Sequence, residues 1–80
     1  MNGLRVYINS VGTDTLSGHG VFYSRREDGP YYLWRYEQEI GQWRGSRVRS
    51  YDLTPKALCV ASWKVVPIAL QARLGEHYLE

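Results

Sequence analysis

The chain has almost no cysteine, the residue whose disulfide bonds stabilise many small secreted domains: its 80 residues include a single one. Cys59 alone cannot form an internal disulfide, which favours a reducing, cytoplasmic environment. No stretch approaches the roughly 20 consecutive apolar residues that span a bilayer. The first residues also lack the apolar run of a signal peptide. We therefore expect neither a disulfide framework nor a membrane segment.

Residues suited to catalysis or metal binding are equally sparse. The two histidines, His19 and His77, lie far apart, and neither has a cysteine or carboxylate neighbour at metal-ligand spacing. The glycines on either side of His19 lack the lysine and the following helix of a phosphate loop. Cys59 lies in an apolar run that we interpret as helical, which predicts an inert, buried thiol. We expect no enzyme activity, no cofactor and no metal.

Aromatic residues and arginine are what the chain has in abundance. Three Trp, seven Tyr and one Phe make up 14% of the sequence, and eight of the ten positive residues are Arg. Arginine stacks on rings and forms paired hydrogen bonds with carboxylates or phosphates, which lysine does less well. The net charge is +2, and removing Leu79 and Glu80 raises it to +3. These two residues are either native or a cloning remnant, so the predicted single domain covers residues 1–78.

Alternation of apolar and polar residues, together with β-prone runs, predicts strands in the first part of the chain. The expected strands are residues 4–8, 19–26, 31–39 and 42–51. Thr54 and Pro55 then form a favourable helix start, and Pro67 should kink or break the helix that follows. The predicted fold is α+β, a four-stranded, mostly antiparallel β-meander followed by a C-terminal helix. That helix should pack on one face of the sheet.

Helical spacing predicts which residues face the sheet. After Pro67, residues four apart line one face of the helix, namely Val66, Leu70, Leu74 and Tyr78. Before Pro67, the same role falls to Leu58, Ala61 and Val65. The predicted core is Leu4, Val6, Ile8, Trp34, Leu58, Ala61, Leu70 and Leu74.

Turn geometry predicts which side chains share a face of the sheet. A two-residue turn at Asp28 and Gly29 would place Tyr23 opposite Trp34. A second two-residue turn ending at Gly41 would align the next hairpin. One face then collects Val21, Tyr23, Arg25, Tyr32, Trp34, Tyr36, Trp43, Arg47 and Arg49. The other carries Phe22, Leu33 and Val48 among polar residues, with an ion pair between Glu37 and Arg44.

Two interpretations of the aromatic face follow. In the first, this face packs against the helix, and Arg25, Arg47 and Arg49 reach outward at its edge. In the second, the helix covers the opposite face and leaves an exposed platform of aromatic rings and arginines. A small domain needs its large side chains inside, so we favour the first.

Tyrosine, tryptophan and arginine together are the residues that dominate binding hot spots. We therefore expect a protein-binding module, monomeric or homodimeric, that binds an acidic protein through its sheet face or through the strand edge at residues 42–51. Weak nucleic-acid binding by the basic sheet is the alternative, which the carboxylates expected in the same sheet disfavour. The candidate partner-binding residues are Arg25, Tyr32, Trp34, Trp43, Arg44, Arg47 and Arg49.

Overall fold

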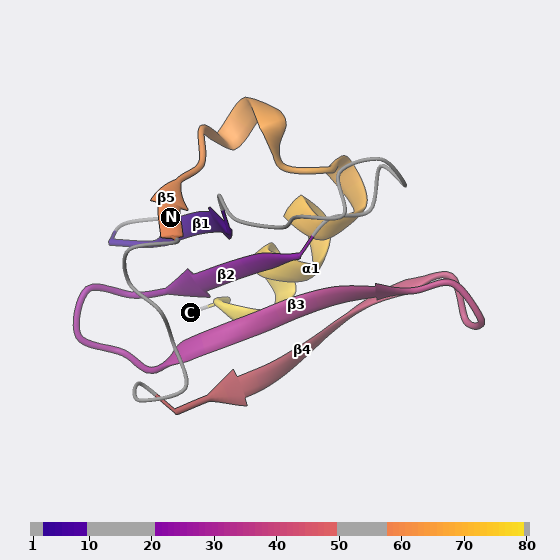
Figure 1. Ribbon diagram of the computed structural model, residues 1–80, viewed down its shortest axis with the longest axis horizontal. Helices are drawn as coiled ribbons and strands as arrows, with labels where there is room; N and C mark the ends of the chain where they lie inside the picture. The colour runs from indigo at the N-terminus through magenta and orange to yellow at the C-terminus, as the bar shows by residue number, and fades with distance from the viewer. Residues whose placement is uncertain (1–2, 10–20, 50–57, 80) are drawn as a thin grey trace.

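A computed structural model of the protein describes residues 3–9, 21–49 and 58–79. The strands are β1 (Arg5–Asn9), β2 (Phe22–Arg25), β3 (Tyr31–Glu37), β4 (Gln42–Val48) and β5 (Leu58–Val60). A short 3-10 helix, η4 (Trp63–Val65), and the α-helix α1 (Ile68–His77) follow. All neighbouring strands are antiparallel, in the order β4-β3-β2-β1-β5 (Figure 1). The predicted α+β class and antiparallel meander with a C-terminal helix are confirmed, with a fifth strand added.

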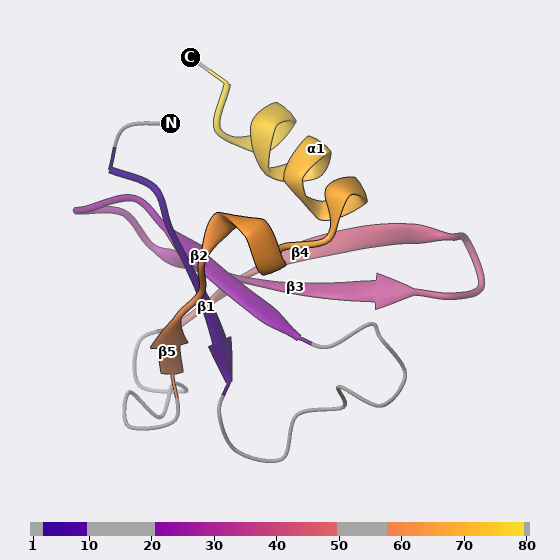
Figure 2. The ribbon, with the colours of Figure 1, turned by 90° about the horizontal axis from the view of Figure 1, so that it is seen from above.

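Helix α1 lies on one side of the sheet (Figure 2), and we call that side the covered face. The four residues predicted from their spacing are all buried beneath it: Val66, Leu70, Leu74 and Tyr78. On the sheet side they meet Val6, Phe22, Trp34 and Trp43. The predicted core residues Leu4, Ile8 and Ala61 are half-buried against this cluster, and the side chain of Leu58 lies outside the described residues.

A buried chain of hydrogen bonds joins the sheet to the end of the helix. The Trp34 indole N–H donates to the Ser24 hydroxyl oxygen at 2.8 Å. The Ser24 and Tyr78 hydroxyls share a second bond of 2.8 Å. Ser24 is completely buried, so these bonds satisfy polar groups that water cannot reach. The chain therefore fixes how α1 docks.

Burial raises the pKa of the Tyr78 hydroxyl, and the hydrogen bond with Ser24 offsets only part of that rise. The folded protein thus holds this proton more tightly than the unfolded chain does. The resulting stabilisation is complete below about pH 10 and is lost as the pH rises through the folded-state pKa. We expect the free energy of unfolding to fall above about pH 10, and to fall less steeply in Tyr78→Phe. Urea titrations across this range measure both slopes, and equal slopes would contradict a role for Tyr78.

The first hairpin turns earlier than predicted. The Gly29 N–H donates to the Arg26 carbonyl at 3.0 Å, which closes a turn around Glu27 and Asp28. Neither Asp28 nor Gly29 has the positive φ that the predicted turn requires. A tight turn with Asp28 and Gly29 at its centre is therefore wrong.

This earlier turn shifts the pairing of β2 with β3 by one residue. Phe22 lies opposite Trp34, whereas the prediction placed Tyr23 there. Because side chains alternate between faces, a one-residue shift exchanges the two faces of a strand. Phe22 and Ser24 therefore lie on the covered face, and Tyr23 and Arg25 lie on the opposite one.

The second hairpin is shifted by two residues, which leaves the faces as predicted. Its turn spans residues 38–41, Gly41 has φ 64°, and Trp34 lies opposite Gly45. Trp34 and Trp43 remain on one face, and that face packs under the helix. The interpretation in which the helix covers the aromatic side chains is correct for β3 and β4. The predicted ion pair of Glu37 with Arg44 is confirmed at 2.9 Å.

Residues 58–60 form a strand, so the predicted helix before Pro67 is wrong there. Cys59 pairs with Ile8 of β1 and is exposed, so the predicted buried thiol is also wrong. Val65 is 60% exposed and lines no helical face. The expected start at residues 54 and 55 lies outside the described residues. The break near Pro67 is confirmed, because α1 begins directly after Pro67.

Candidate functional site

The face of the sheet opposite α1 carries tyrosine and arginine side chains, and no described helix packs on it (Figure 2). The strand registers define its members, and we call it the tyrosine face. These are Arg5, Tyr7, Tyr23, Arg25, Tyr31, Leu33, Arg35, Glu37, Gln42, Arg44, Ser46, Val48 and Val60. The arginines Arg5, Arg35 and Arg44 are exposed, whereas the tyrosines are half-buried. The face thus has an aromatic floor with charged groups above it.

Contacts on this face hold one arginine firmly against the rings. The rings of Tyr7 and Tyr31 lie 5.8 Å apart, centroid to centroid. The Arg25 guanidinium lies 4.9 Å from the Tyr31 centroid and donates to the Tyr31 hydroxyl at 3.2 Å. That hydrogen bond raises the pKa of Arg25. Arg25 also donates to the carbonyls of Arg26 and Glu27, so its side chain is fixed in place.

Two pairs of arginines lie directly opposite each other across neighbouring strands. Arg5 faces Arg25 between β1 and β2, and Arg35 faces Arg44 between β3 and β4. Like charges directly opposite destabilise a sheet. Glu37 neutralises only the charge of Arg44, whose guanidinium donates hydrogen bonds of 2.9 and 3.1 Å to the two carboxylate oxygens. Within residues 3–9, 21–49 and 58–79, the side chains of Arg5 and Arg35 have no hydrogen bond or ion pair, so no described residue neutralises these two charges.

Negative charge is scarce on the tyrosine face. Its four arginines and the single carboxylate of Glu37 give a net charge of 4 − 1 = +3. The whole chain carries only +2. Glu27, Asp28 and Glu39, expected to dilute the charge of the sheet, lie in the turns instead. The expected objection to an anionic ligand therefore does not apply to this face.

A hollow of about 430 Å³ adjoins the tyrosine face where β4 ends. We call it the arginine hollow; its lining is Arg25, Gly29, Pro30, Tyr31, Arg47, Val48 and Arg49. Three of the predicted partner-binding residues line it, namely Arg25, Arg47 and Arg49. Arg25 belongs to the tyrosine face, whereas Arg47 lies opposite Tyr32 on the covered face. Arginine side chains suit a phosphate or carboxylate ligand.

Three other predicted site residues belong to the interior. Trp34 and Trp43 are only 1% and 4% exposed, so they pack against the helix and present no surface to a partner. Tyr32 is half-buried against His77, with ring centroids 4.4 Å apart. The assignment of Trp34 and Trp43 as a partner surface is corrected, because a small core takes up its largest rings, whereas Tyr32 keeps a partly exposed side chain. Arg44, the remaining predicted residue, lies on the tyrosine face.

Five tyrosines and arginines of the face were not among the predicted site residues, namely Arg5, Tyr7, Tyr23, Tyr31 and Arg35. Arg5 and Tyr7 alternate with apolar residues in the first predicted strand, so that pattern already placed them on an outward face. Tyr23 was expected on the face of Trp34, and the one-residue shift in the first hairpin moves it to the tyrosine face.

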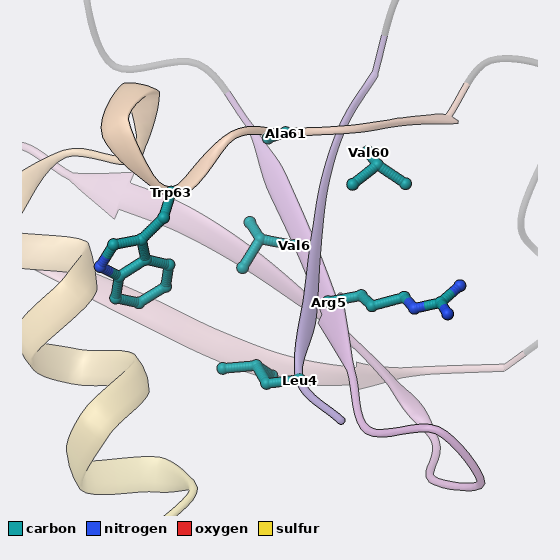
Figure 3. A pocket seen from close by; sticks show the side chains of 6 residues that line it. All are labelled: Leu4, Arg5, Val6, Val60, Ala61 and Trp63. Atoms are coloured by element: carbon teal, nitrogen blue, oxygen red, sulfur yellow. The ribbon is translucent and has the colours of Figure 1, made fainter. Parts of the chain in front are cut away.

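A second hollow, of about 380 Å³, lies beside β1 where β5 stops pairing with it (Figure 3). Its lining is Leu4, Arg5, Val6, Val60, Ala61 and Trp63. Figure 3 shows Leu4, Val6 and Trp63 on one side of β1, and Arg5 with Val60 on the other. Apart from Arg5, this lining is apolar, so it offers one charged contact against the several of the arginine hollow.

Among the described residues, no three His, Cys, Asp or Glu side chains are grouped so that they could hold a metal ion. None of the described helices has the length and apolar character to cross a membrane. Comparison with protein-family models, curated proteins and solved structures found no match to this chain. The tyrosine face and the arginine hollow are therefore the features of this chain that bear on its function.

Proposed function

We propose that this protein is a non-catalytic binding module that holds a polyanionic partner on its tyrosine face. The observation that carries this proposal is the presence of two directly opposed arginine pairs, Arg5 with Arg25 and Arg35 with Arg44. Such pairs cost stability unless an anion neutralises them. A bound polyanion would do so at several points at once.

Further features of the face support binding over a purely structural role. Tyr31 and Arg25 are residue types that recur in binding hot spots, and Arg25 is already held in one orientation. A preordered side chain loses less conformational freedom when a partner binds. The exposed Arg5 and Arg35 add further positive charge on the same face.

A protein that adds a strand to the sheet is the second candidate. No strand among the described residues pairs with the outer edge of β4, which leaves a row of backbone groups for an extended peptide. Arg44 and Arg47 on that strand would select an acidic peptide. We also propose a cytoplasmic location, because the thiol of Cys59 is exposed and free.

Fluorescein-labelled heparin tests the proposal as a generic polyanion. We expect Arg35→Gln to weaken heparin binding about tenfold, the equivalent of 1.4 kcal/mol, at low salt. Lys64→Gln is the matched control, since it removes one exposed positive charge from η4 instead of from the tyrosine face. Equal losses in the two variants, or no binding by the parent protein, would contradict the proposal.

A further inference from the structure

We infer that the polyanion is a single-stranded nucleic acid whose bases stack on the tyrosines while its backbone follows the arginines. This inference rests on the proposed function and names the ligand class for the same face. It follows from how the rings and charges are ordered in neighbouring rows across the strands.

The first row crosses the sheet at the end nearest the 26–30 turn and carries two arginines. Arg5 of β1 faces Arg25 of β2, and Tyr31 of β3 faces Val48 of β4. Two rows further along the strands, Arg35 of β3 faces Arg44 of β4. The arginines of this face thus form a basic track on both sides of the row between them, for successive phosphates.

The adjacent row, two residues further along each strand, is aromatic and apolar. Tyr7 faces Tyr23, and Tyr23 faces Leu33. Tyr31, from the first row, leans toward Tyr7 with its ring centroid 5.8 Å away. The half-buried rings thus form a floor directly beside the basic track, which is the arrangement that bases need in order to stack.

This order of rows distinguishes nucleic acid from an acidic protein. Carboxylates of an acidic peptide would use the arginines alone, whereas every nucleotide supplies both a phosphate for the arginines and a planar base for the tyrosines. A duplex is disfavoured as well, because its base faces are stacked inside the helix and cannot lie on the tyrosines. Only a single strand uses both rows together.

The size of the face sets the length of the bound segment. From β1 to β4 there are three inter-strand spacings of about 4.8 Å, which is about 14 Å in total. Bases that lie on the tyrosines are splayed apart, so this distance accommodates only a few nucleotides. We therefore expect a short footprint, weak intrinsic affinity and little base specificity.

Fluorescence anisotropy with a labelled 12-nucleotide oligo-dT tests the inference, with a duplex of the same length, poly-glutamate and heparin as competitors. We expect Tyr23→Leu to weaken oligo-dT binding at least fivefold while leaving heparin binding nearly unchanged. Tyr23→Phe keeps the ring and should retain oligo-dT affinity. Trp63→Leu removes an exposed ring outside the tyrosine face and serves as the control. Arg35→Gln should lower the slope of log affinity against log salt by about one.

The possible results separate the inference from the proposed function. Heparin binding without oligo-dT binding, or stronger competition by the duplex or poly-glutamate, would overturn the inference and leave the function standing. Absence of any polyanion binding would overturn both. Backbone amide shifts of the parent protein on adding oligo-dT give a test that needs no variant. Shifts at Tyr7, Tyr23 and Tyr31 are expected, and shifts confined to helix α1 would refute base stacking on this face.

Discussion

Replacement of Leu70 by alanine is expected to lower the free energy of unfolding by about 2–5 kcal/mol. The Leu70 side chain has no exposed surface, and it lies at the centre of the face that α1 turns toward the sheet. Its neighbours there are Val66, Leu74 and the buried rings of the sheet. A domain of this size has a total stability of only about 4–12 kcal/mol, so the loss is a large share.

The matched control for Leu70→Ala lies on the same helix. Ile68 is 82% exposed, so Ile68→Ala should change the free energy of unfolding by no more than about 0.5 kcal/mol. Urea denaturation followed by tryptophan fluorescence measures both variants. A Leu70→Ala protein with the midpoint of the parent would show that α1 does not dock on the sheet as described.

Addition of one methyl group at Gly45 is also expected to destabilise the fold strongly. A Cβ atom at this position would lie 2.7 Å from two carbons of the Trp34 ring, closer than real Cβ contacts come. Trp34 is 1% exposed and donates its indole N–H to Ser24, so the ring cannot move aside without breaking that bond. Overpacking typically costs about 1–3 kcal/mol, and we expect Gly45→Ala to reach the top of this range.

A double-mutant cycle identifies the cause of the Gly45→Ala effect. In a Trp34→Leu background the clash disappears, so the added methyl group should cost much less there than in the parent protein. Ser46→Ala, at the exposed neighbouring position, should be nearly neutral. A Gly45→Ala protein as stable as the parent would contradict the close approach of Trp34 to β4.

The C-terminal helix could be predicted from the sequence, because the position of Pro67 and the spacing of the residues after it indicated the same helix. Pro67 fixed where a helix can begin, and the spacing of Leu70, Leu74 and Tyr78 fixed which side it buries. The face shared by Trp34 and Trp43 was also predictable, since an error of two residues in the second turn leaves side chains on the same face.

The composition of the candidate site was less predictable, because it depended on one turn. Asp28 and Gly29 suggested a tight turn, but the chain turns around Glu27 and Asp28. This difference of one residue moves Tyr23 from the face that it was expected to share with Trp34 to the tyrosine face. The assignment of residues 58–60 failed for another reason, since a short apolar run suits a helix or a strand equally well. The outer edge of β1, far away in the sequence, determines that these residues pair as a strand.

The position of β1 between β2 and β5 has a consequence for the order of folding during synthesis on a ribosome. The hairpins of β2, β3 and β4 join neighbouring segments and can form early, whereas β5 reaches β1 only after a loop of some fifty residues closes. Helix α1 emerges later still. Until it does, Phe22, Trp34 and Trp43 of the nascent sheet form an exposed hydrophobic surface that is prone to aggregate. We therefore expect the nascent chain to depend on chaperones most after β4 has been synthesised and before Tyr78 has left the ribosome.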